Sequence, residues 1–236
     1  MSTATASNAP ASATGTGTTT TANHPPPFRF PREHSFPPFF TLQPNATTRH
    51  AQLTKWSSLV LAYARHHRLF RLSVSSSTSS STTTTSSSSA ATGDGDAAAA
   101  SPLFRNKTLD RRLSPADVRE ILAFMRREGR VETVPGGGNG SGNGNGSGKG
   151  DEDGDVVFIY WRKPEEWARL VEDYVERTGQ KGAVMTIYEL AEGEATRGSE
   201  LHGIDADVLR RALGVLVKKG RAQIFGQDGS QGVKFF

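Results

Sequence analysis

Hydrophobic residues recur at helical spacing in two stretches of the chain, and the two stretches resemble each other. Residues 56–63 read WSSLVLAY, and residues 167–174 read WARLVEDY. In both stretches the Trp is followed by Leu, Val and Tyr after three, four and seven positions. This spacing places the four side chains on one face of an α-helix. The repeat therefore predicts two equivalent helices and indicates an internal duplication.

A second pair of stretches, residues 113–134 and 204–225, supports the duplication. Each opens with a residue suited to cap a helix, continues with an apolar helical stripe and reaches a glycine that suits a left-handed helix end. A short apolar stretch typical of a strand follows in both. The caps are Ser114 and Asp205, and the glycines are Gly129 and Gly220.

Each copy predicts the order helix, short middle element, helix, strand, turn, strand. In the second copy Thr186 and Glu189 form a capping box for a short helix that ends near Gly193. The closing strands are predicted at residues 156–161 and 232–236, the latter after a turn at Asp228-Gly229. Three helices closed by a two-stranded hairpin follow the winged-helix plan. We therefore predict an α+β fold with two tandem winged-helix domains.

Low-complexity stretches set the domain boundaries. Tracts of Thr, Ser, Ala, Gly and Asn carry too little apolar surface to offset the entropy of the chain. The predicted organisation is a disordered tail at 1–27, an extended Pro/Phe partner-binding segment at 28–45, a first winged-helix domain at 46–161 with insertions at 75–101 and 136–155, and a second winged-helix domain at 162–236.

The sequence offers little for catalysis. The chain has no cysteine, which excludes disulfides, thiolate metal sites and thiol nucleophiles. Among its six histidines no pair has the i, i+4 helical spacing of a metal site, and no serine sits in a nucleophile motif. We therefore expect no enzyme, catalytic residue, metal or cofactor. The N-terminus has no signal-peptide pattern, and we expect a cytoplasmic protein without membrane spans.

Charge bears on the main alternative function, nucleic-acid binding by a winged-helix protein. The net charge of +4 comes from the N-terminal part, because residues 162–236 hold twelve basic and twelve acidic residues. A DNA reader needs cations along the exposed face of its last helix. The last helix of each predicted domain mixes acids with bases, and residues 151–155 near the wing are acidic. We therefore expect no nucleic-acid partner.

The stretch at residues 28–45 reads FRFPREHSFPPFFTLQPN and combines five Phe with four Pro. Proline this dense prevents an α-helix or a central strand, so local structure cannot shelter the aromatic rings. One hypothesis is a stiff, extended peptide whose Phe side chains enter pockets of a partner. The alternative is that the rings fold back on the first domain. The first hypothesis predicts that Phe39 and Phe40 can be replaced by Ala without unfolding either domain.

Several strings then carry a family resemblance. The sequences SFPPFFTLQPN, VVFIYWRKPEEWARLVEDYV and DGSQGVKFF, spread from Ser35 to the C-terminus, resemble the small winged-helix subunits of the ESCRT-II endosomal sorting complex. The resemblance covers almost all the residues that we predict to be ordered. The Thr-rich N-terminus, the Ser/Thr tract and the Gly/Asn loop depart from the family without touching these motifs.

The resemblance implies a non-catalytic subunit, present in two copies, that binds two larger winged-helix subunits. It implies that the second domain recruits the initiating ESCRT-III subunit while ubiquitinated membrane cargo is sorted into multivesicular bodies. The protein would be cytoplasmic and recruited to the endosomal membrane, which it would contact only through the complex. The family's partner-binding positions fall on Phe36, Pro37, Pro38, Phe39, Phe40 and Arg111.

Overall fold

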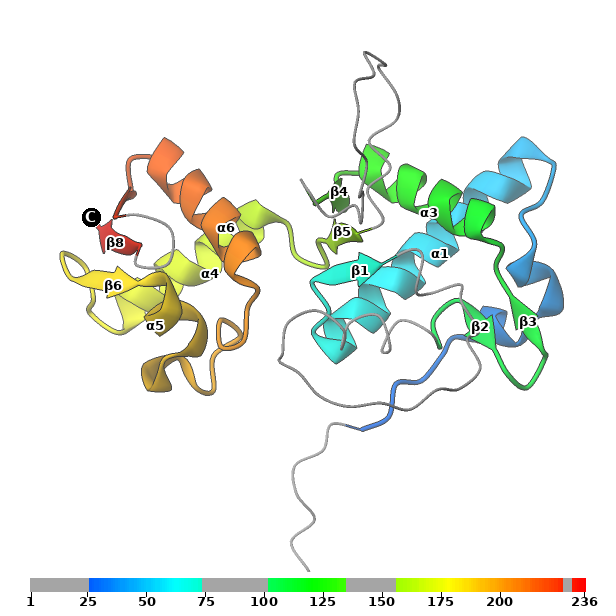
Figure 1. Ribbon diagram of the computed structural model, residues 1–236, viewed down its shortest axis with the longest axis horizontal. Helices are drawn as coiled ribbons and strands as arrows, with labels where there is room; N and C mark the ends of the chain where they lie inside the picture. Colours follow the sequence, from blue (N-terminus) through cyan, green and yellow to red (C-terminus); the bar gives the residue numbers. More distant parts are fainter. Residues whose placement is uncertain (1–25, 74–101, 135–155, 227–230) are drawn as a thin grey trace, which may run out of the picture.

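The computed structural model describes residues 26–73, 102–134, 156–226 and 231–236. The predicted insertions, the predicted turn at Asp228-Gly229 and the predicted tail apart from Pro26 and Pro27 lie outside these residues. The helices and strands form two units that lie side by side along the long axis of the molecule (Figure 1). The chain passes once from the first unit to the second, between β5 and α4.

The first unit begins with two short 3₁₀ helices and then alternates long helices with short strands. Its elements are η1 (Arg32–Ser35), η2 (Pro37–Phe40), α1 (Ala46–His67), β1 (Arg71–Ser73), β2 (Arg105–Asn106), β3 (Arg111–Arg112), α3 (Pro115–Arg127), β4 (Val131–Thr133) and β5 (Val156–Ile159).

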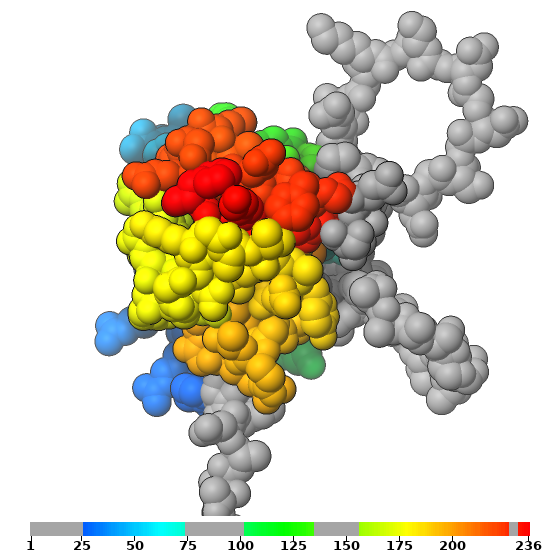
Figure 2. Space-filling model, turned by 90° about the vertical axis from the view of Figure 1, so that its left-hand side faces the viewer, coloured from blue at the N-terminus to red at the C-terminus, as the bar shows by residue number. Residues whose placement is uncertain are grey.

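The second unit repeats the plan of helix, middle element, helix and hairpin. Its elements are α4 (Pro164–Arg177), β6 (Val184–Thr186), α5 (Ile187–Glu192), η3 (Glu194–Thr196), α6 (Ala206–Lys218), β7 (Ala222–Phe225) and β8 (Gly232–Phe235). Figure 2 looks onto this unit, where the C-terminal residues (red) lie between those near β6 (yellow) and those of α6 (orange).

The predicted helix caps are confirmed. Asp117 N donates to Ser114 Oγ at 3.1 Å, and Val208 N donates to Asp205 Oδ1 at 3.2 Å. Thr186 accepts from Glu189 N at 3.0 Å, and the Glu189 carboxylate accepts in return from Thr186 N. These side chains satisfy backbone donors that the first helical turn leaves without partners. The two predicted helix-end glycines, Gly129 and Gly220, both have positive φ, at 67° and 68°.

Each unit holds a three-stranded antiparallel sheet, with the strand orders β1-β5-β4 and β6-β8-β7. The predicted closing hairpins are present, and β1 and β6 each add a third strand that was not predicted. Leu72 of β1 pairs with Val157, and Met185 of β6 pairs with Val233. A strand of three residues is too short for an apolar alternation to stand out in the sequence. Such a short strand is recognised only by its hydrogen bonds to the neighbouring strand.

Two hydrophobic cores share strand β5. Val157 and Ile159 pack into the first core, whereas Phe158 and the adjoining Tyr160 pack into the second. Alternate side chains of a strand point to opposite faces, so this strand lies between the two cores and is buried on both sides. The second core is therefore partly closed by the first unit, which the predicted boundary after residue 161 did not suggest.

Ion pairs surround this shared layer. Arg71 Nε lies 2.8 Å from Asp205 Oδ2, and Arg211 lies 3.0 Å from Glu132 Oε1. The two guanidinium carbons lie 5.0 and 4.2 Å from the centroid of the Phe158 ring, within the range of cation–π attraction. Arg211 thus joins the second unit to the first through both a carboxylate and an aromatic ring, whereas Arg71 reaches the second unit through Asp205 and contacts Phe158 within its own unit.

Glu132 is held from both units. The Tyr160 hydroxyl of the first unit donates to Glu132 Oε2 at 2.6 Å, and Arg211 of the second unit donates to Oε1. Desolvation alone would raise the pKa of Glu132, but these two hydrogen bonds outweigh it and the pKa lies below its ordinary value. The carboxylate therefore stays ionised between the units.

Candidate partner-binding surface

The N-terminal segment (residues 26–45) is folded, and the prediction of an extended peptide is wrong. It forms η1 and η2, with Pro37 and Pro38 in the first turn of η2. Proline is tolerated there because the first turn needs no backbone N–H donor and its φ suits a helical start. The Phe39 N–H donates to Phe36 O at 2.9 Å, and the Thr41 N–H donates to Pro38 O at 3.3 Å. Dense proline excludes long helices but permits these single turns.

Phe39 and Phe40 are buried in the first core, with exposed fractions of 5% and 3%. The Phe39 ring stacks on Trp56 of α1 with centroids 4.3 Å apart, and the Phe40 ring meets Trp56 edge-on at 5.6 Å. These two rings find shelter within the chain, which corrects the prediction that they are left for a partner. Their replacement by Ala without loss of folding is no longer expected.

Helix α1 also holds the backbone of η2. Gln52 Nε2 lies 2.9 Å from Phe39 O and 3.0 Å from Thr41 O, and Trp56 Nε1 donates to Phe39 O at 3.0 Å. Gln52 Oε1 accepts from Gln43 N at 3.1 Å. Gln52 is a buried polar residue, and such groups need hydrogen-bond partners. Gln52 lies on the apolar face of α1. A polar residue at such a position is the sequence signal that could have identified it.

The other half of the predicted binding motif remains on the surface. Phe36 is 59% exposed, and Pro37 and Pro38 are also exposed. We call these three residues the Phe36 ridge. A groove of about 400 Å³ lies beside it, between η2 and α1, and Phe36, Pro38, Ala51 and Lys55 contribute to its lining. A fixed apolar ridge next to a groove has the shape of a docking surface rather than of a flexible ligand.

Lys55 and Glu33 close one side of this groove. Lys55 Nζ of α1 lies 3.0 Å from Glu33 Oε1 of η1. The hydrogen bond from Lys55 lowers the pKa of Glu33. The pair is largely exposed, so it contributes little to stability. It nevertheless adds a polar edge to an otherwise apolar groove.

Arg111 lies in β3, in a short antiparallel hairpin with β2, and not at the start of a helix. It pairs with Asn106 across the hairpin, and its side chain is exposed. Within the described ranges, no hydrogen bond or ion pair engages the Arg111 guanidinium. An exposed cation of this kind is free to meet an acidic group of another protein.

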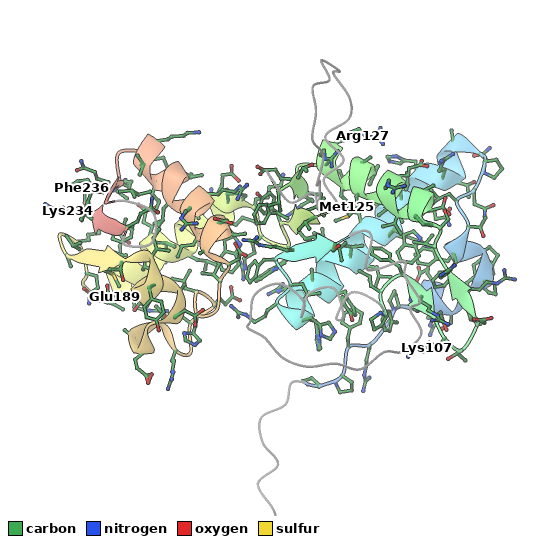
Figure 3. All side chains as sticks on the ribbon, in the orientation of Figure 1. Lys107, Met125, Arg127, Glu189, Lys234 and Phe236 are labelled. Atoms are coloured by element: carbon green, nitrogen blue, oxygen red, sulfur yellow. The ribbon has the colours of Figure 1, made fainter. Side chains whose placement is uncertain are left out.

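The hairpin is strongly basic as a whole. We call it the basic hairpin; its cations are Arg105, Lys107, Arg111 and Arg112, and its one acid is Asp110. Lys107 lies at the end of the hairpin, at the edge of the molecule (Figure 3). Strand β3 contacts η2, so the basic hairpin and the Phe36 ridge lie next to each other. The structure thus brings together Arg111 and residues 36–38, but it withdraws Phe39 and Phe40 into the core.

The second unit also exposes large hydrophobic side chains. They lie on β6, α5, α6 and β7 and at the C-terminal residue: Val184, Tyr188, Val217, Phe225 and Phe236. A groove of about 780 Å³ runs between the end of α1 and α5, with Arg68 and Phe70 on one side and Ile187 and Tyr188 on the other. The sequence did not single out any of these residues.

The described residues contain no cluster of three or more His, Asp or Glu side chains that could hold a metal ion. No helix in the same part of the chain is both long and apolar enough to cross a bilayer.

A comparison with protein families identifies the family to which this chain belongs. A model described as "ESCRT-II complex subunit" matches residues 33–205, which is most of the chain. The chain belongs to the ESCRT-II subunit family. The ESCRT-II match begins inside η1 and includes the whole Phe36 ridge, the basic hairpin and the layer shared by the two cores.

Curated relatives agree over nearly their full length. Vacuolar protein-sorting-associated protein 25 of Drosophila melanogaster is 38% identical over 209 residues, covering 89% of this chain and 98% of the relative. The proteins of the same name from Danio rerio and Homo sapiens are both 35% identical, with 89% of this chain covered and 99% and 98% of the relatives.

Solved ESCRT-II structures share the fold. A crystal structure of subunit VPS25 of the endosomal trafficking complex ESCRT-II matches with a TM-score of 0.65 and 26% identity, covering 87% of this chain and 98% of that one. A chain from the crystal structure of the endosomal complex ESCRT-II (VPS22/VPS25/VPS36) matches with a TM-score of 0.64 over the same shares. The mixed α+β fold of this family member is thereby confirmed.

Proposed function

We propose that this chain is a non-catalytic assembly subunit of ESCRT-II. In this proposal two copies enter each complex, each bound to one of two larger winged-helix subunits, and each recruits the initiating ESCRT-III subunit. The complex would sort ubiquitinated membrane cargo into multivesicular bodies from the cytoplasmic side of the endosome. The observation that carries the proposal is the Phe36 ridge, which α1 holds in one geometry on the surface.

The ridge supports a partner that offers an apolar pocket. Burial of one Phe side chain is worth roughly 1.5 to 3 kcal/mol. With Phe39 and Phe40 in the core, Phe36 is the single large anchor of the motif, and the two prolines add rigid apolar surface. Because η2 is already ordered, binding loses less conformational entropy than it would for a free peptide. Phe36 alone does not offset the cost of association, so the two prolines and the basic hairpin must add to the contact.

The basic hairpin supports a partner that is acidic next to that pocket. Its four cations face a single acid, and Arg111 is free to form an ion pair with a partner carboxylate. Charges at the rim of an interface chiefly raise the association rate and fix orientation. We infer that the larger ESCRT-II subunits present an apolar pocket beside acidic side chains.

The second unit is the proposed contact for ESCRT-III. Residues 162–236 carry their own exposed apolar side chains, at some distance along the molecule from the Phe36 ridge. Exposed apolar patches rimmed by polar groups are typical of interaction sites. A winged-helix interpretation of both units accords with their order of helices and their three-stranded sheets.

The nucleic-acid alternative loses support from α6, the helix that would read DNA. Arg210 lies 2.5 Å from Asp207, and Arg211 is paired with Glu132 of the first unit. Two of the four cations of this helix region are thus already neutralised by carboxylates, which phosphate would have to displace.

Co-purification with the two larger subunits tests the proposal. We expect Phe36→Ala to weaken binding roughly 10- to 100-fold, as the loss of one buried Phe implies. Arg111→Asp should weaken binding by a smaller factor that shrinks as salt is added. Tyr188→Ala removes an exposed ring from the other unit and serves as the matched control for folding and for this interface. Complex formation that is unchanged by Phe36→Ala would refute the assignment.

A further inference from the structure

His34 is buried between the N-terminal segment and the rest of the first unit. It belongs to η1, and only 4% of the residue is exposed. Its ring stacks on Phe30 with centroids 4.1 Å apart and meets Phe40 edge-on at 5.1 Å. A buried histidine needs hydrogen-bond partners for both ring nitrogens, and these partners determine its protonation state.

The hydrogen bonds around His34 select one neutral tautomer. Asn106 Oδ1 accepts from the backbone N–H groups of Thr108 and Leu109, at 3.0 and 3.1 Å. The amide nitrogen of Asn106 must therefore face His34, where it lies 2.7 Å from the backbone oxygen and 3.4 Å from Nδ1. On the other side, Nε2 lies 3.3 Å from Leu103 O, which can only accept. The ring therefore carries hydrogen on Nε2 and accepts at Nδ1.

A second proton on this ring would be unfavourable where it stands. It would place an N–H on Nδ1, directly against the donating amide of Asn106, and would bury a positive charge. Burial lowers the pKa of His34, and the Leu103 carbonyl opposes this only in part. The protonated ring is better accommodated in water than in this site.

Within the described residues no charged side chain pairs with the His34 ring, and Arg32 of η1 and Arg111 of β3 are exposed. Glu33, its neighbour in η1, is paired with Lys55 of α1, and Arg105 of β2 lies 3.9 Å from Asp110. The ring contacts on α1 and η2 are Trp56 and Phe40, which carry no charge.

Other titratable groups on α1 face the same segment further along. Tyr63 stacks on Phe30 at 5.8 Å, and burial raises its pKa. His66 Nε2 lies 2.7 Å from Pro26 O, and the rings of His66 and His67 lie 5.3 and 6.1 Å from Phe28. Burial lowers the pKa of His67, and these side chains lie near residues 26–28, so an experiment must separate them from His34.

We propose that His34 is a proton-sensitive latch that holds residues 26–40 on the first unit and so presents the Phe36 ridge. The neutral ring stabilises the docked segment, and a proton on Nδ1 weakens docking. The latch itself concerns this chain alone, whereas its consequence for partner binding rests on the proposed function.

The direction of the pH effect follows from the lowered pKa. The docked segment favours neutral His34, and the released segment titrates near the ordinary value of about 6.5. Docking is therefore at full strength above that pH and weakens as the pH falls below it, by up to roughly tenfold per pH unit for one linked proton.

Hydrogen exchange on the full chain, corrected for the intrinsic effect of pH, tests the latch. Between pH 7.5 and 5.5 we expect roughly tenfold loss of protection at the amides of His34, Phe36 and Phe39, which donate within η1 and η2. His34→Gln keeps a donor for Leu103 O but cannot titrate, so this variant should lose the dependence. His66→Gln and His50→Gln, the latter at an exposed α1 position, should retain it. Equal protection at both pH values, or an unchanged loss in His34→Gln, would overturn the proposal.

A second measurement covers the case in which His34→Gln fails to dock. A histidine-selective ¹⁵N titration of the native chain should show His34 with hydrogen on Nε2 at pH 7.5 and a midpoint below 6.5. The opposite tautomer, or a midpoint at or above 6.5, would contradict the latch.

Calorimetry with the larger subunits separates this proposal from the proposed function. Loss of binding at pH 5.5 that tracks segment release supports both. Segment release without loss of binding would preserve the latch and remove the Phe36 ridge from the interface.

Discussion

The two units cover equivalent tryptophans in different ways. Trp56 of α1 lies beneath the N-terminal segment, with the Phe39 ring stacked on it at 4.3 Å. Trp167 of α4 instead meets Trp161 at 5.0 Å and Phe70 at 6.1 Å, both from the first unit or its end. One tryptophan is covered by a short stretch of chain and the other by a folded unit.

This difference shows that the N-terminal segment is divided between the core and the surface. Its second half, Phe39 and Phe40, closes the first core, as the sheet of the first unit helps to close the second. Its exposed middle, the Phe36 ridge, is the part that we propose binds other proteins. Because both parts belong to one turn of 3₁₀ helix, the core contact determines the geometry of the Phe36 ridge.

The largest expected effect comes from removal of the cover over Trp56. Phe39→Ala and Phe40→Ala each delete a buried ring, which typically lowers the free energy of unfolding by about 3 to 5 kcal/mol. Chemical denaturation should show both losses, while Phe36→Ala, an exposed position, should change stability by less than about 0.5 kcal/mol. If Phe39→Ala proved as mild as Phe36→Ala, the segment would not be part of the core.

The next effect concerns the hydrogen bonds that fix η2. Gln52→Ala removes hydrogen bonds to Phe39 O and Thr41 O, each worth about 0.5 to 1.5 kcal/mol. Trp56 Nε1 still donates to Phe39 O and Gln43 Nε2 to Thr41 O, so neither carbonyl loses its last partner. Thr54→Ala, at an exposed position of the same helix, is the matched control. We expect Gln52→Ala also to weaken partner binding, because the ridge loses its support. Full stability in this variant would argue against a role for α1 in holding η2.

The smallest expected change in stability comes from the contacts of Arg211 with the first unit. Arg211→Ala removes an ion pair with Glu132 and a cation–π contact with Phe158, each worth on the order of 1 kcal/mol or less at a partly exposed site. A double-mutant cycle with Glu132→Ala isolates the ion pair. Arg177→Ala, exposed on α4, should be neutral. Absence of any coupling would mean that apolar packing alone joins the units.

Local signals in the sequence predicted local structure well. Ser114, Thr186 and Asp205 cap helices as expected, and the repeated Trp positions lie in the two cores. These features depend on spacing within one or two helical turns, which the sequence displays directly.

Features that depend on distant partners could not be predicted in the same way. The dense prolines correctly excluded an α-helix at residues 36–40. They gave no indication that Phe39 stacks on Trp56. The unbroken apolar run at residues 156–161 is typical of a strand buried on both faces, a signal that was available for the layer shared by the cores. The pairing of Arg71 and Arg211 with the opposite unit had no local signal at all. The partner-binding roles of the Phe36 ridge and Arg111 stay predictions.

The central claim is that one motif is divided between the core and the surface. Hydroxyl-radical footprinting of Phe36, Phe39 and Phe40, with and without the larger ESCRT-II subunits, tests it most directly. The account predicts that Phe36 reacts in the free chain and is protected in the complex, while Phe39 and Phe40 are protected in both. Reactive Phe39 and Phe40 in the free chain, or equal reactivity of Phe36 in both states, would contradict it.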